Sequence, residues 1–596
     1  MSGQDFTDEQ KRYLEGFVSG VQASRAAAGL KPLAGVGGGG AAEPAGPDAE
    51  HLKAMARFEA EGKKLSPEEK AKRDEHPFDA YARLKAESAK GQYAKGVDNF
   101  RWRFHGLFYV APAQNAYMCR LRVPNGILTH WQLAGVADIA ERYCHGYAHV
   151  TTRANLQVRE IAAETAIAVL EDLAEIGLVA KGSGADNIRN VTGSPTAGID
   201  AQELLDSRPY ARAWHHHILN DRSLYGLPRK FNVGYDGGGI IPVLEDTNDI
   251  AFTAVRVADG AGVEPGVWFR LGLGGITGHQ DFARPTGVLV KPEDAVAVAD
   301  AIVRVFIDHG DRADRKKARL KYVLDDWGFD KFLVAVEAKL GRSLARVPQD
   351  FVTEPNRQDR QAHIGVHAQK QAGRVWVGVS LPVGRMTVAQ MRGLARISQD
   401  FGDGDIRLTV WQNLLISGVA DDKADEVEQR LQAIGLTAKA SSVRAGLVAC
   451  TGNTGCKLAN SNTKDTALAI AAHVEAHVPL DTPINVHLTG CPNSCAQHYI
   501  GDIGLIGCRV PLADSDDMVE GFHVHVGGGF GAEAAIAREL FRDVKVDDCP
   551  AVVARILAAY MANRAGVDER FVTFSRRTDV AVLRAMVEAV DLEAVA

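Results

Sequence analysis

Four of the eight cysteines in this chain form two close pairs, and their side chains are the ones best suited to hold a metal centre. Cys450 and Cys456 have a C-x5-C spacing, and Cys491 and Cys495 have a C-x3-C spacing. Each pair lies among Gly, Asn, Thr and Pro residues, which let the backbone turn and direct N–H groups toward the sulfurs. Because such N–H groups stabilise an anionic metal–sulfur cluster, the pattern favours an iron–sulfur site.

Two other uses of paired cysteines stay open. Structural zinc ligands usually come in pairs separated by about two to four residues, so the five-residue gap favours a cluster over zinc. Disulfides are less expected, because the first residues lack the charged and then apolar pattern of a secretory signal. We therefore expect reduced thiols and a cytoplasmic location. The remaining cysteines are interpreted as packing residues: Cys119, Cys144, Cys508 and Cys549.

Composition sets the class of protein. A chain of 596 residues with 46% hydrophobic residues can form several hydrophobic cores, so we expect a large protein of several domains. No apolar run approaches the ~20 residues that cross a bilayer, which predicts no membrane association. The net charge of −7, with both signs mixed, does not indicate nucleic-acid binding.

The first hundred residues differ from the rest of the chain. They contain a helix candidate at residues 7–28, a Gly- and Pro-rich linker at residues 35–47, and a charged helical stretch up to residue 89. We interpret residues 1–100 as a peripheral helical and linker extension.

The remainder of the chain contains an internal repeat. Residues 123–129 (Val-Pro-Asn-Gly-Ile-Leu-Thr) match residues 381–387 (Leu-Pro-Val-Gly-Arg-Met-Thr) at an offset of 258. The same offset places residues 153–156 beside residues 411–414, and Asp249-Ile250 lies beside Asp502-Ile503 with only a small drift. We therefore expect two similar copies of about 200 residues, related by a pseudo-twofold axis.

Each copy alternates between strand and helix patterns. In the first copy, apolar and polar residues alternate over residues 117–123 and again over residues 148–158, and a helical pattern runs from about residue 130 to 144. This predicts an α/β fold of the α+β type, built from internally duplicated mixed lobes.

The two copies differ in chemistry. Strand periodicity puts Arg120 and Arg122 on one face, and Arg153, Asn155 and Gln157 on one face of the neighbouring strand. Further donors stand next to turn residues, at Arg189 and Lys230. Because guanidinium forks and ammonium groups bind carboxylates and small oxyanions, the first copy predicts an anionic partner. Only the second copy carries the cysteine pairs.

These motifs together resemble the assimilatory nitrite and sulfite reductases that contain siroheme and a 4Fe-4S cluster. The resemblance rests on the two cysteine pairs and on four segments, and it covers about residues 95–590: residues 118–126 (Met-Cys-Arg-Leu-Arg-Val-Pro-Asn-Gly), 151–157 (Thr-Thr-Arg-Ala-Asn-Leu-Gln), 186–190 (Asp-Asn-Ile-Arg-Asn) and 228–232 (Pro-Arg-Lys-Phe-Asn). It implies ferredoxin-like half-domains at residues 101–178 and 351–438. It also implies cofactor-binding α/β lobes at residues 179–350 and 439–596.

The resemblance also implies roles for individual residues. Cys450, Cys456, Cys491 and Cys495 hold the cluster, and the Cys495 thiolate bridges it to the siroheme iron. Substrate is bound on the open face of the siroheme by Arg120, Arg189, Lys230 and Asn232. The macrocycle, with its eight carboxylates, is bound by Arg122, Arg153, Asn155, Gln157 and Arg229. The implied reaction is the six-electron reduction of nitrite to ammonia, with Lys230 as the proton donor.

Substrate and electron donor are expectations of the same kind. Sulfite-reducing members commonly carry a second lysine where this chain has Asn232, so nitrite is expected and sulfite is the alternative. No flavin or nicotinamide fingerprint is present, which implies an acidic protein donor such as ferredoxin. A candidate docking surface is the basic segment 312–321, and the chain is expected to be a monomer. A non-catalytic iron–sulfur carrier or sensor is the second alternative.

Overall fold

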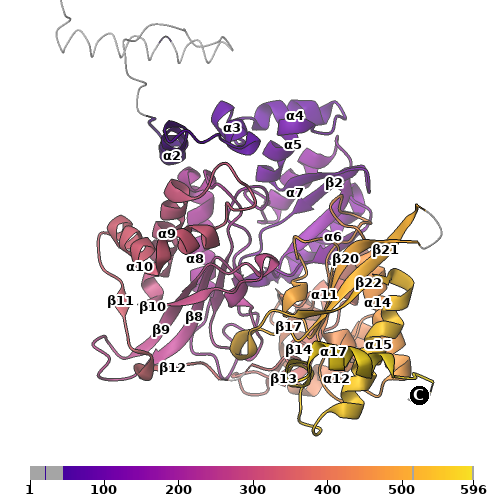
Figure 1. Ribbon diagram of the computed structural model, residues 1–596. Coiled ribbons are helices and arrows are strands. Elements are labelled where there is room, and N and C mark those ends of the chain that lie inside the picture. The colour runs from indigo at the N-terminus through magenta and orange to yellow at the C-terminus, as the bar shows by residue number, and fades with distance from the viewer. Residues whose placement is uncertain (1–20, 22–43, 357, 513–515, 594–596) are drawn as a thin grey trace, which may run out of the picture. The chain divides into compact units, whose positions relative to one another are not determined.

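The structure is a computed structural model that describes residues 21, 44–356, 358–512 and 516–593 (Figure 1). It divides into two compact units, Met1–Gly46 and Pro47–Ala596, and everything below concerns the second. The helix expected at residues 7–28 lies outside the described residues except for residue 21, and so does most of the expected linker.

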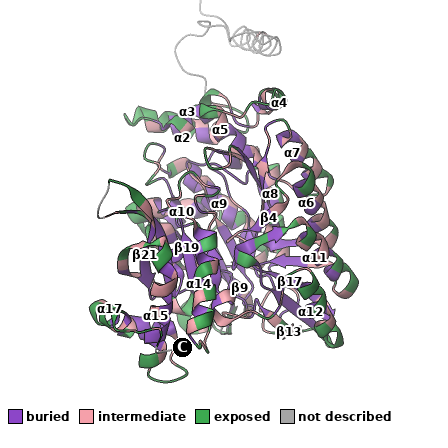
Figure 2. Cartoon of the chain, turned by 90° about the vertical axis from the view of Figure 1, so that its right-hand side faces the viewer, coloured by how far each residue is buried: buried purple, intermediate pink, exposed green. Residues whose placement is uncertain are grey.

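The second unit begins with four helices, which lie along one edge of it in Figures 1 and 2. They are α2 (Ala49–Ala60), α3 (Pro67–Asp74), α4 (Tyr81–Ala89) and α5 (Gly96–Trp102). Helix α3 starts where Ser66 accepts a hydrogen bond from the Glu69 N–H, with Pro67 at its first position. Its buried Lys72 donates to the carbonyl of Leu227 at 2.7 Å, so this extension is attached to the body of the unit.

Two five-stranded sheets form the centre of the repeat, and each contains one strand from the other copy. The first has the order β1 (Leu107–Val110), β2 (Ala116–Arg120), β5 (Leu156–Ile161), β4 (Tyr147–Val150), β15 (Arg385–Thr387). The second has the order β13 (Gly365–Ala368), β14 (Arg374–Val379), β17 (Leu414–Ala420), β16 (Asp405–Leu408), β3 (Ile127–Thr129). β3 and β15 are equivalent strands, and each pairs with the sheet of the other copy. This reciprocal exchange holds the two copies together through backbone hydrogen bonds.

The helices of these halves confirm the offset of 258. They are α6 (His130–Tyr143) and α7 (Ala166–Glu175) in the first half, and α11 (Val388–Phe401) and α12 (Ala424–Ala433) in the second. A capping box at Thr129 and Gln132 starts α6, and the same box at Thr387 and Gln390 starts α11. Identical local capping therefore positions equivalent helices.

Two larger lobes complete the duplication. The first lobe has the sheet order β11 (Ala345–Arg346), β10 (Arg284–Val290), β9 (Gly266–Leu273), β8 (Ile250–Val257), β7 (Val233–Asp236), β6 (Thr192–Gly193), with β12 (Val352–Thr353) paired to β8. Its helices are α8 (Arg208–Asn220), α9 (Ala295–His309) and α10 (Leu320–Leu340).

The second lobe has a sheet with the order β18 (Leu447–Ala449), β19 (Val486–Thr489), β20 (Ile503–Pro511), β21 (Met518–Val526), β22 (Arg538–Lys545). Its helices are α13 (Ser442–Ala445), α14 (Thr463–His477), α15 (Cys549–Asn563), α16 (Phe571–Arg577) and α17 (Val580–Glu588).

Both lobes repeat one pairing pattern, in which three parallel strands are followed by antiparallel ones. β6, β7 and β8 are parallel, as are β18, β19 and β20. The next strands, β9 and β10 or β21 and β22, run antiparallel. The predicted duplicated α/β fold is confirmed. Each lobe has its own apolar core, and the half-domains share a third one. Among the described residues, no helix is long and apolar enough to cross a membrane.

One predicted element is wrong. Residues 148–158 do not form a single strand, because β4 ends at Val150 and β5 begins at Leu156, and the two pair as an antiparallel hairpin. Ala154 has a φ of 45° in the connecting turn. Alternating residues persist through a tight hairpin, so alternation alone did not reveal the turn.

Candidate active site

The four predicted thiols follow neighbouring strands of the second lobe. Cys450 comes directly after β18 and Cys491 shortly after β19, so the carboxyl ends of two adjacent parallel strands carry the pairs. Cys456 and Cys495 lie in the loops that follow, and all four residues line one cavity. The Gly490 N–H donates to the Cys450 sulfur at 3.2 Å, as expected for a loop that surrounds thiolates. All four cysteines are free of disulfides.

The distances between the four sulfur atoms favour a cluster over a single zinc ion. Thiolates about 2.3 Å from one tetrahedral zinc lie about 3.8 Å from each other. No three of these four sulfurs, all of which lie in described residues, come within 4.8 Å of one another. Two other groups of three possible ligand side chains, elsewhere in the described residues, do. Burial raises the pKa of Cys450 to about 11, and the neighbouring Cys495 adds to the effect, so a cationic centre is needed to hold several thiolates together. The donor set fits a polynuclear iron–sulfur cluster.

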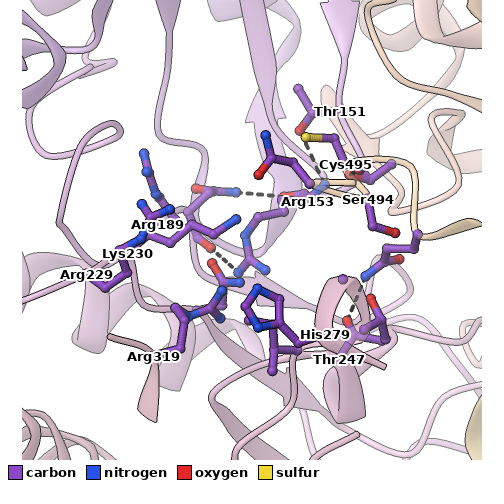
Figure 3. Close-up of a pocket in the computed structure, with 18 of the residues that line it drawn as sticks. Thr151, Arg153, Arg189, Arg229, Lys230, Thr247, His279, Arg319, Ser494 and Cys495 are labelled. Carbon is purple, nitrogen blue, oxygen red and sulfur yellow. Dashed lines mark hydrogen bonds between the residues drawn. The ribbon is translucent and has the colours of Figure 1, made fainter. Parts of the chain in front are cut away.

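A second cavity is lined mainly by the first copy and is rich in cations (Figure 3). Its basic side chains are Arg120, Arg153, Arg189, Arg229, Lys230, His279, Arg315 and Arg319. Figure 3 shows Arg189, Arg229 and Lys230 on one side, and Cys495 with Ser494 on the other. Polar residues from both copies complete the lining: Asn155, Gln157, Asn190, Asn232, Thr247 and Gln497.

The turn between β4 and β5 positions Arg153 in this cavity. Its guanidinium donates to the Asn248 side chain at 2.7 Å and to the Asn190 carbonyl at 2.6 Å. The Asn190 amide donates back to the Arg153 carbonyl at 3.0 Å, so the turn and the loop before β6 hold each other in place. Asn155 is buried, and its side-chain oxygen has no partner among the described residues. The Nε–H of Arg153 also has no partner among the described residues, so this arginine can donate to a carboxylate, whereas the Asn155 oxygen can only accept from a donor on the ligand.

Loops at the amino ends of β6 and β7 supply the next cations. Arg189 precedes β6, and Lys230 and Asn232 precede β7. No carboxylate of the described residues lies within ion-pair distance of Lys230, Arg189, Arg153 or Arg120 (4.0 Å), because the ion pairs of the first lobe go to other residues. Buried cations without counter-ions create a strong preference for a bound anion.

The pKa directions agree with this uncompensated charge. Burial first, and the nearby Arg319 second, lower the pKa of Lys230 to about 7. Burial lowers the pKa of Arg153 to about 9 and also lowers the pKa values of Arg120 and Arg189. Because an anion reverses each of these shifts, its binding would favour the protonated side chains.

The structure gives a place in the site to Arg319, which the sequence pattern had put in the exposed segment 312–321. Arg319 is buried in an ion pair with Asp249 at 2.6 Å, and it lines the cavity. The same carboxylate accepts the Asn232 N–H at 2.8 Å, so Asp249 holds Arg319 and Asn232 side by side. The internal repeat could have pointed to Arg319. It aligns Asp249 with Asp502, and an acid that is buried in both copies needs a basic partner in each.

The predicted docking surface at residues 312–321 is only partly present, because Lys316 and Lys317 are the only exposed basic residues of this described segment. Arg312 is 2% exposed and pairs with Glu69, and Arg319 faces the cavity. Arg315 donates to Asp186 at 2.7 Å and lines the cavity as well. A run of positive charge indicated an exposed helix face, but helix α10 begins only at Leu320, and the loop before it turns its arginines inward.

Arg122 lies outside both cavities. It is 1% exposed, and its guanidinium donates to the carbonyls of Gly182 at 3.2 Å and Ile188 at 2.8 Å. This arginine therefore positions the loop that carries Arg189. The other predicted site residues of the first copy all line the cationic cavity: Arg120, Arg153, Asn155, Gln157, Arg189, Arg229, Lys230 and Asn232.

The two cavities adjoin each other at Cys495. They share five lining residues: Arg120, Thr151, Thr152, Gln157 and Cys495. The Thr152 hydroxyl donates to the Cys495 carbonyl at 2.9 Å, and the Gln497 amide donates to Thr247 at 2.8 Å, so contacts between the copies position this cysteine. The thiol cavity and the cationic cavity thus form one continuous site between the two copies.

Family models match most of the chain. The nitrite and sulphite reductase 4Fe-4S domain matches residues 184–344 and 440–593. The nitrite/sulfite reductase ferredoxin-like half domain matches residues 111–176 and 367–434. Each model matches twice, which agrees with the duplication.

Whole relatives and a solved structure agree with these models. The chain is 34% identical to ferredoxin–nitrite reductase of Synechococcus elongatus over 513 residues, covering 84% of this chain and 98% of that protein. It is 35% identical to the chloroplastic ferredoxin–nitrite reductase of Zea mays, covering 83% and 89%. The Mycobacterium tuberculosis NirA protein superposes with a TM-score of 0.80 at 28% identity, covering 88% and 98%. This chain belongs to the nitrite and sulphite reductase family.

Proposed function

We propose that this chain reduces nitrite to ammonia with six electrons from reduced ferredoxin, using a 4Fe-4S cluster and siroheme. The observation that carries the proposal is the cationic cavity, which adjoins the four-cysteine cavity at Cys495 and in which Arg120, Arg153, Arg189 and Lys230 have no ion-pair partner among the described residues. Ferredoxin–nitrite reductases from a cyanobacterium and a plant align over most of the chain, which supports the same reaction here.

The residues present fit both cofactors. Four cysteines around one cavity would hold the cluster, and Cys495, which also lines the cationic cavity, would be the cluster ligand nearest to the siroheme. We assign Arg153, Asn155, Gln157 and Arg229 to the siroheme carboxylates, because they are polar residues that line the cationic cavity. When bound, the cofactors supply electrons one at a time and a metal that coordinates the substrate.

The remaining cations are assigned to the substrate. Arg120, Arg189 and Lys230 attract the nitrite anion and stabilise charge that develops on its oxygens. Each oxygen must leave as water, so the reaction consumes protons as well as electrons. Burial lowers the pKa of Lys230 to about 7 in the site without an anion, and a bound anion opposes this shift, so Lys230 is protonated and can donate a proton when substrate is present. Asn232 can donate a hydrogen bond without adding charge.

Sulfite reduction is the second candidate, since the family includes sulfite reductases. Nitrite is favoured by one feature, the neutral amide of Asn232 beside Lys230. A monoanion needs less positive charge than the dianion sulfite, because each uncompensated buried charge is costly.

A competition assay tests the function. The purified holoprotein is given equal concentrations of nitrite and sulfite with reduced ferredoxin, and ammonia and sulfide are measured. Ammonia should be the main product, whereas mainly sulfide would assign the alternative. No turnover of either, with a visible spectrum that lacks a haem band, would support the non-catalytic carrier instead.

Several finer predictions accompany this function. We propose the domain division 1–100, 101–178, 179–350, 351–438 and 439–596, a monomeric state and a cytoplasmic location. Of the proposed ferredoxin docking segment 312–321, the exposed Lys316 and Lys317 remain available for docking, whereas Arg312 and Arg319 face inward. Sedimentation of the holoprotein would check the monomer.

A further inference from the structure

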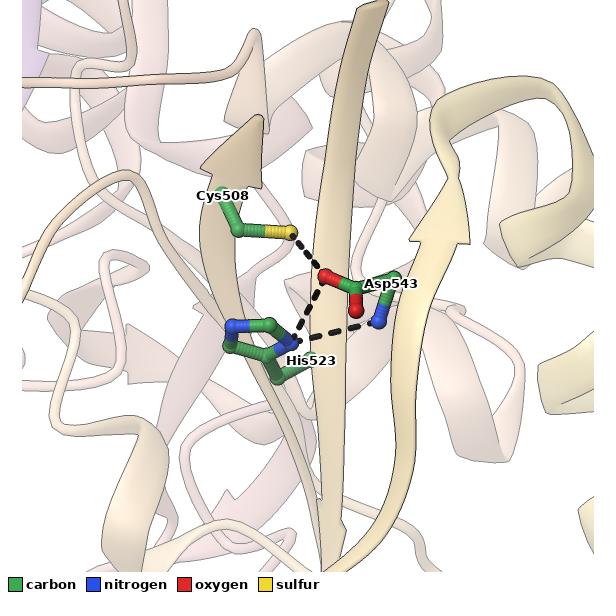
Figure 4. Close-up of side chains that lie close together, drawn as sticks. All are labelled: Cys508, His523 and Asp543. Carbon is green, nitrogen blue, oxygen red and sulfur yellow. Dashed lines mark hydrogen bonds and ion pairs between the residues drawn. The ribbon is translucent and has the colours of Figure 1, made fainter. Parts of the chain in front are cut away.

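Three side chains that can bind a metal gather outside the active site, on the second lobe (Figure 4). They are Cys508 on β20, His523 on β21 and Asp543 on β22. Their ligand atoms all lie within 4.8 Å of one another. The Asp543 oxygen is 3.9 Å from the Cys508 sulfur and 3.7 Å from the His523 Nδ1. Cys508 was interpreted as a packing residue, but the structure places it only partly buried beside these two groups.

The sheet explains how three strands converge on one point. Cys508 pairs with Gly521 and His523 pairs with Ile506, so Cys508 and His523 are diagonal neighbours on one face of the sheet. The pairing of β21 with β22 shifts between Phe522 and Val524, which is a bulge opposite His523. Asp543 lies in this bulge, and its carboxylate reaches the other two side chains (Figure 4).

The chemistry of the group suits a cation. The Asp543 N–H donates to the His523 Nδ1 at 3.2 Å, so this nitrogen is unprotonated and its single lone pair accepts that N–H. A bound cation would take the lone pair in place of this hydrogen bond. Among the described residues, no lysine or arginine nitrogen lies within 4.0 Å of the Asp543 carboxylate, and a neutral His523 does not offset its charge. Burial first, and the adjacent Asp543 second, raise the pKa of the Cys508 thiol to about 11. A bound cation would reverse this shift.

A second group of possible metal ligands differs from this one, because its carboxylates already have a basic partner. His217, Asp221 and Asp300 also lie within 4.8 Å of one another. The guanidinium of Arg304 already pairs with Asp221 at 2.6 Å and with Asp300 at 2.7 Å. The carboxylates of that group therefore have their counter-ion, whereas no lysine or arginine in the part of the chain that the structure describes lies within ion-pair distance of Asp543.

We propose that Cys508, His523 and Asp543 bind one divalent transition-metal ion of the zinc type, with water in the fourth position. One sulfur, one imidazole nitrogen and one carboxylate oxygen form a donor set that zinc accepts. Ligands at about 2.0–2.3 Å from a tetrahedral ion lie about 3.3–3.6 Å apart, so the observed 3.9 and 3.7 Å need only a small closure. The side chains of His523 and Asp543 are 28% and 53% exposed, which leaves a path for the ion and its water.

Such an ion would link β20, β21 and β22 at the bulge. This role does not depend on the reaction at the active site. Its loss would therefore leave the cluster and siroheme in place.

Metal analysis and zinc-edge X-ray absorption of the holoprotein test the site. The protein with its cluster intact is dialysed against zinc chloride and then against zinc-free buffer, and zinc and iron per chain are measured. One zinc per chain is expected, with a spectrum of one sulfur at about 2.3 Å and nitrogen or oxygen ligands at about 2.0 Å. Absence of bound zinc, or a spectrum with several sulfurs, would overturn the proposal, since several sulfurs indicate zinc in the cluster site.

Matched variants assign the ligands. Cys508→Ser, His523→Gln and Asp543→Asn should each lose the zinc and keep wild-type iron and visible spectrum. Two controls should keep the zinc: Cys549→Ser, which alters a nearby thiol in the core of the second lobe, and His217→Gln in the other group. Full zinc in all three ligand variants, or its loss in His217→Gln, would place the ion elsewhere and overturn the assignment.

Discussion

The two large lobes share one sheet pattern, yet they use opposite ends of it. In the first lobe, Arg189 and Lys230 precede β6 and β7, at the amino ends of parallel strands. In the second lobe, Cys450 and Cys491 follow β18 and β19, at the carboxyl ends. The duplication therefore supplied two equal scaffolds, and the loops at one end of each were adapted to different chemistry.

The amino ends of the parallel strands show what both lobes kept. In the first lobe the Asn232 N–H donates to Asp249 at 2.8 Å, and Arg319 pairs with that acid. In the second lobe the Asn485 N–H donates to Asp502 at 2.8 Å, and Arg360 pairs with it. The same buried acid organises both ends, but only Arg319 lines a cavity of the site. Equivalent structure thus serves folding in one lobe, and both folding and binding in the other.

The largest effect is expected at the junction of the lobes. Cys495→Ser should lose or disorder the cluster and abolish turnover, because Cys495 is the one cysteine that lines both cavities. Iron and siroheme per chain and the visible spectrum measure this loss. Cys144→Ser, outside both cavities, is the control and should keep both cofactors. A Cys495→Ser protein with normal iron content and spectrum would remove this residue from the bridge.

Lys230→Ala should keep both cofactors, and its turnover rate should fall roughly a hundred- to ten-thousandfold, because a positioned proton donor usually accelerates a reaction by that factor. Steady-state ammonia production measures it, with the exposed Lys316→Ala as control. Normal nitrite reduction by Lys230→Ala would exclude the lysine from the mechanism.

Arg319→Met and Arg360→Met compare the two lobes directly. Each variant breaks a buried ion pair and should lose about 3–5 kcal/mol of stability, seen as a lower unfolding midpoint. Only Arg319→Met should also raise the KM for nitrite, roughly ten- to a hundredfold, because it removes a charge from the cavity. Equal changes in the KM for nitrite in both variants would mean that Arg319 contributes no more to binding than Arg360 does.

The smallest effect is expected for Asn232→Lys. A second lysine in the cavity should move the ratio of nitrite to sulfite turnover toward sulfite by on the order of tenfold, about 1.4 kcal/mol. The competition assay with both anions measures the ratio, and Asn232→Gln is the neutral control. An unchanged ratio would show that this position does not select the substrate.

Much of the site could be predicted from local patterns. Cysteine spacing indicated the cluster, and eight of the first-copy residues singled out by motif line the cationic cavity. The errors have physical reasons. Alternation runs unbroken through the turn at Ala154, so the hairpin looked like one strand. The arginines of residues 312–321 looked exposed, because no local pattern reveals the buried acids Glu69, Asp186 and Asp249 that they meet.

The sequence by itself determined the duplication, the four thiols and the cationic motifs, because each is a matter of residue type and spacing along the chain. Only the tertiary structure decided that β3 and β15 exchange between the half-domains and that Cys495 lies where both cavities meet. Thr152 and Cys495, which hydrogen-bond there, are more than three hundred residues apart in the chain. Contacts over such separations arise from packing whole lobes together, and no local period encodes them.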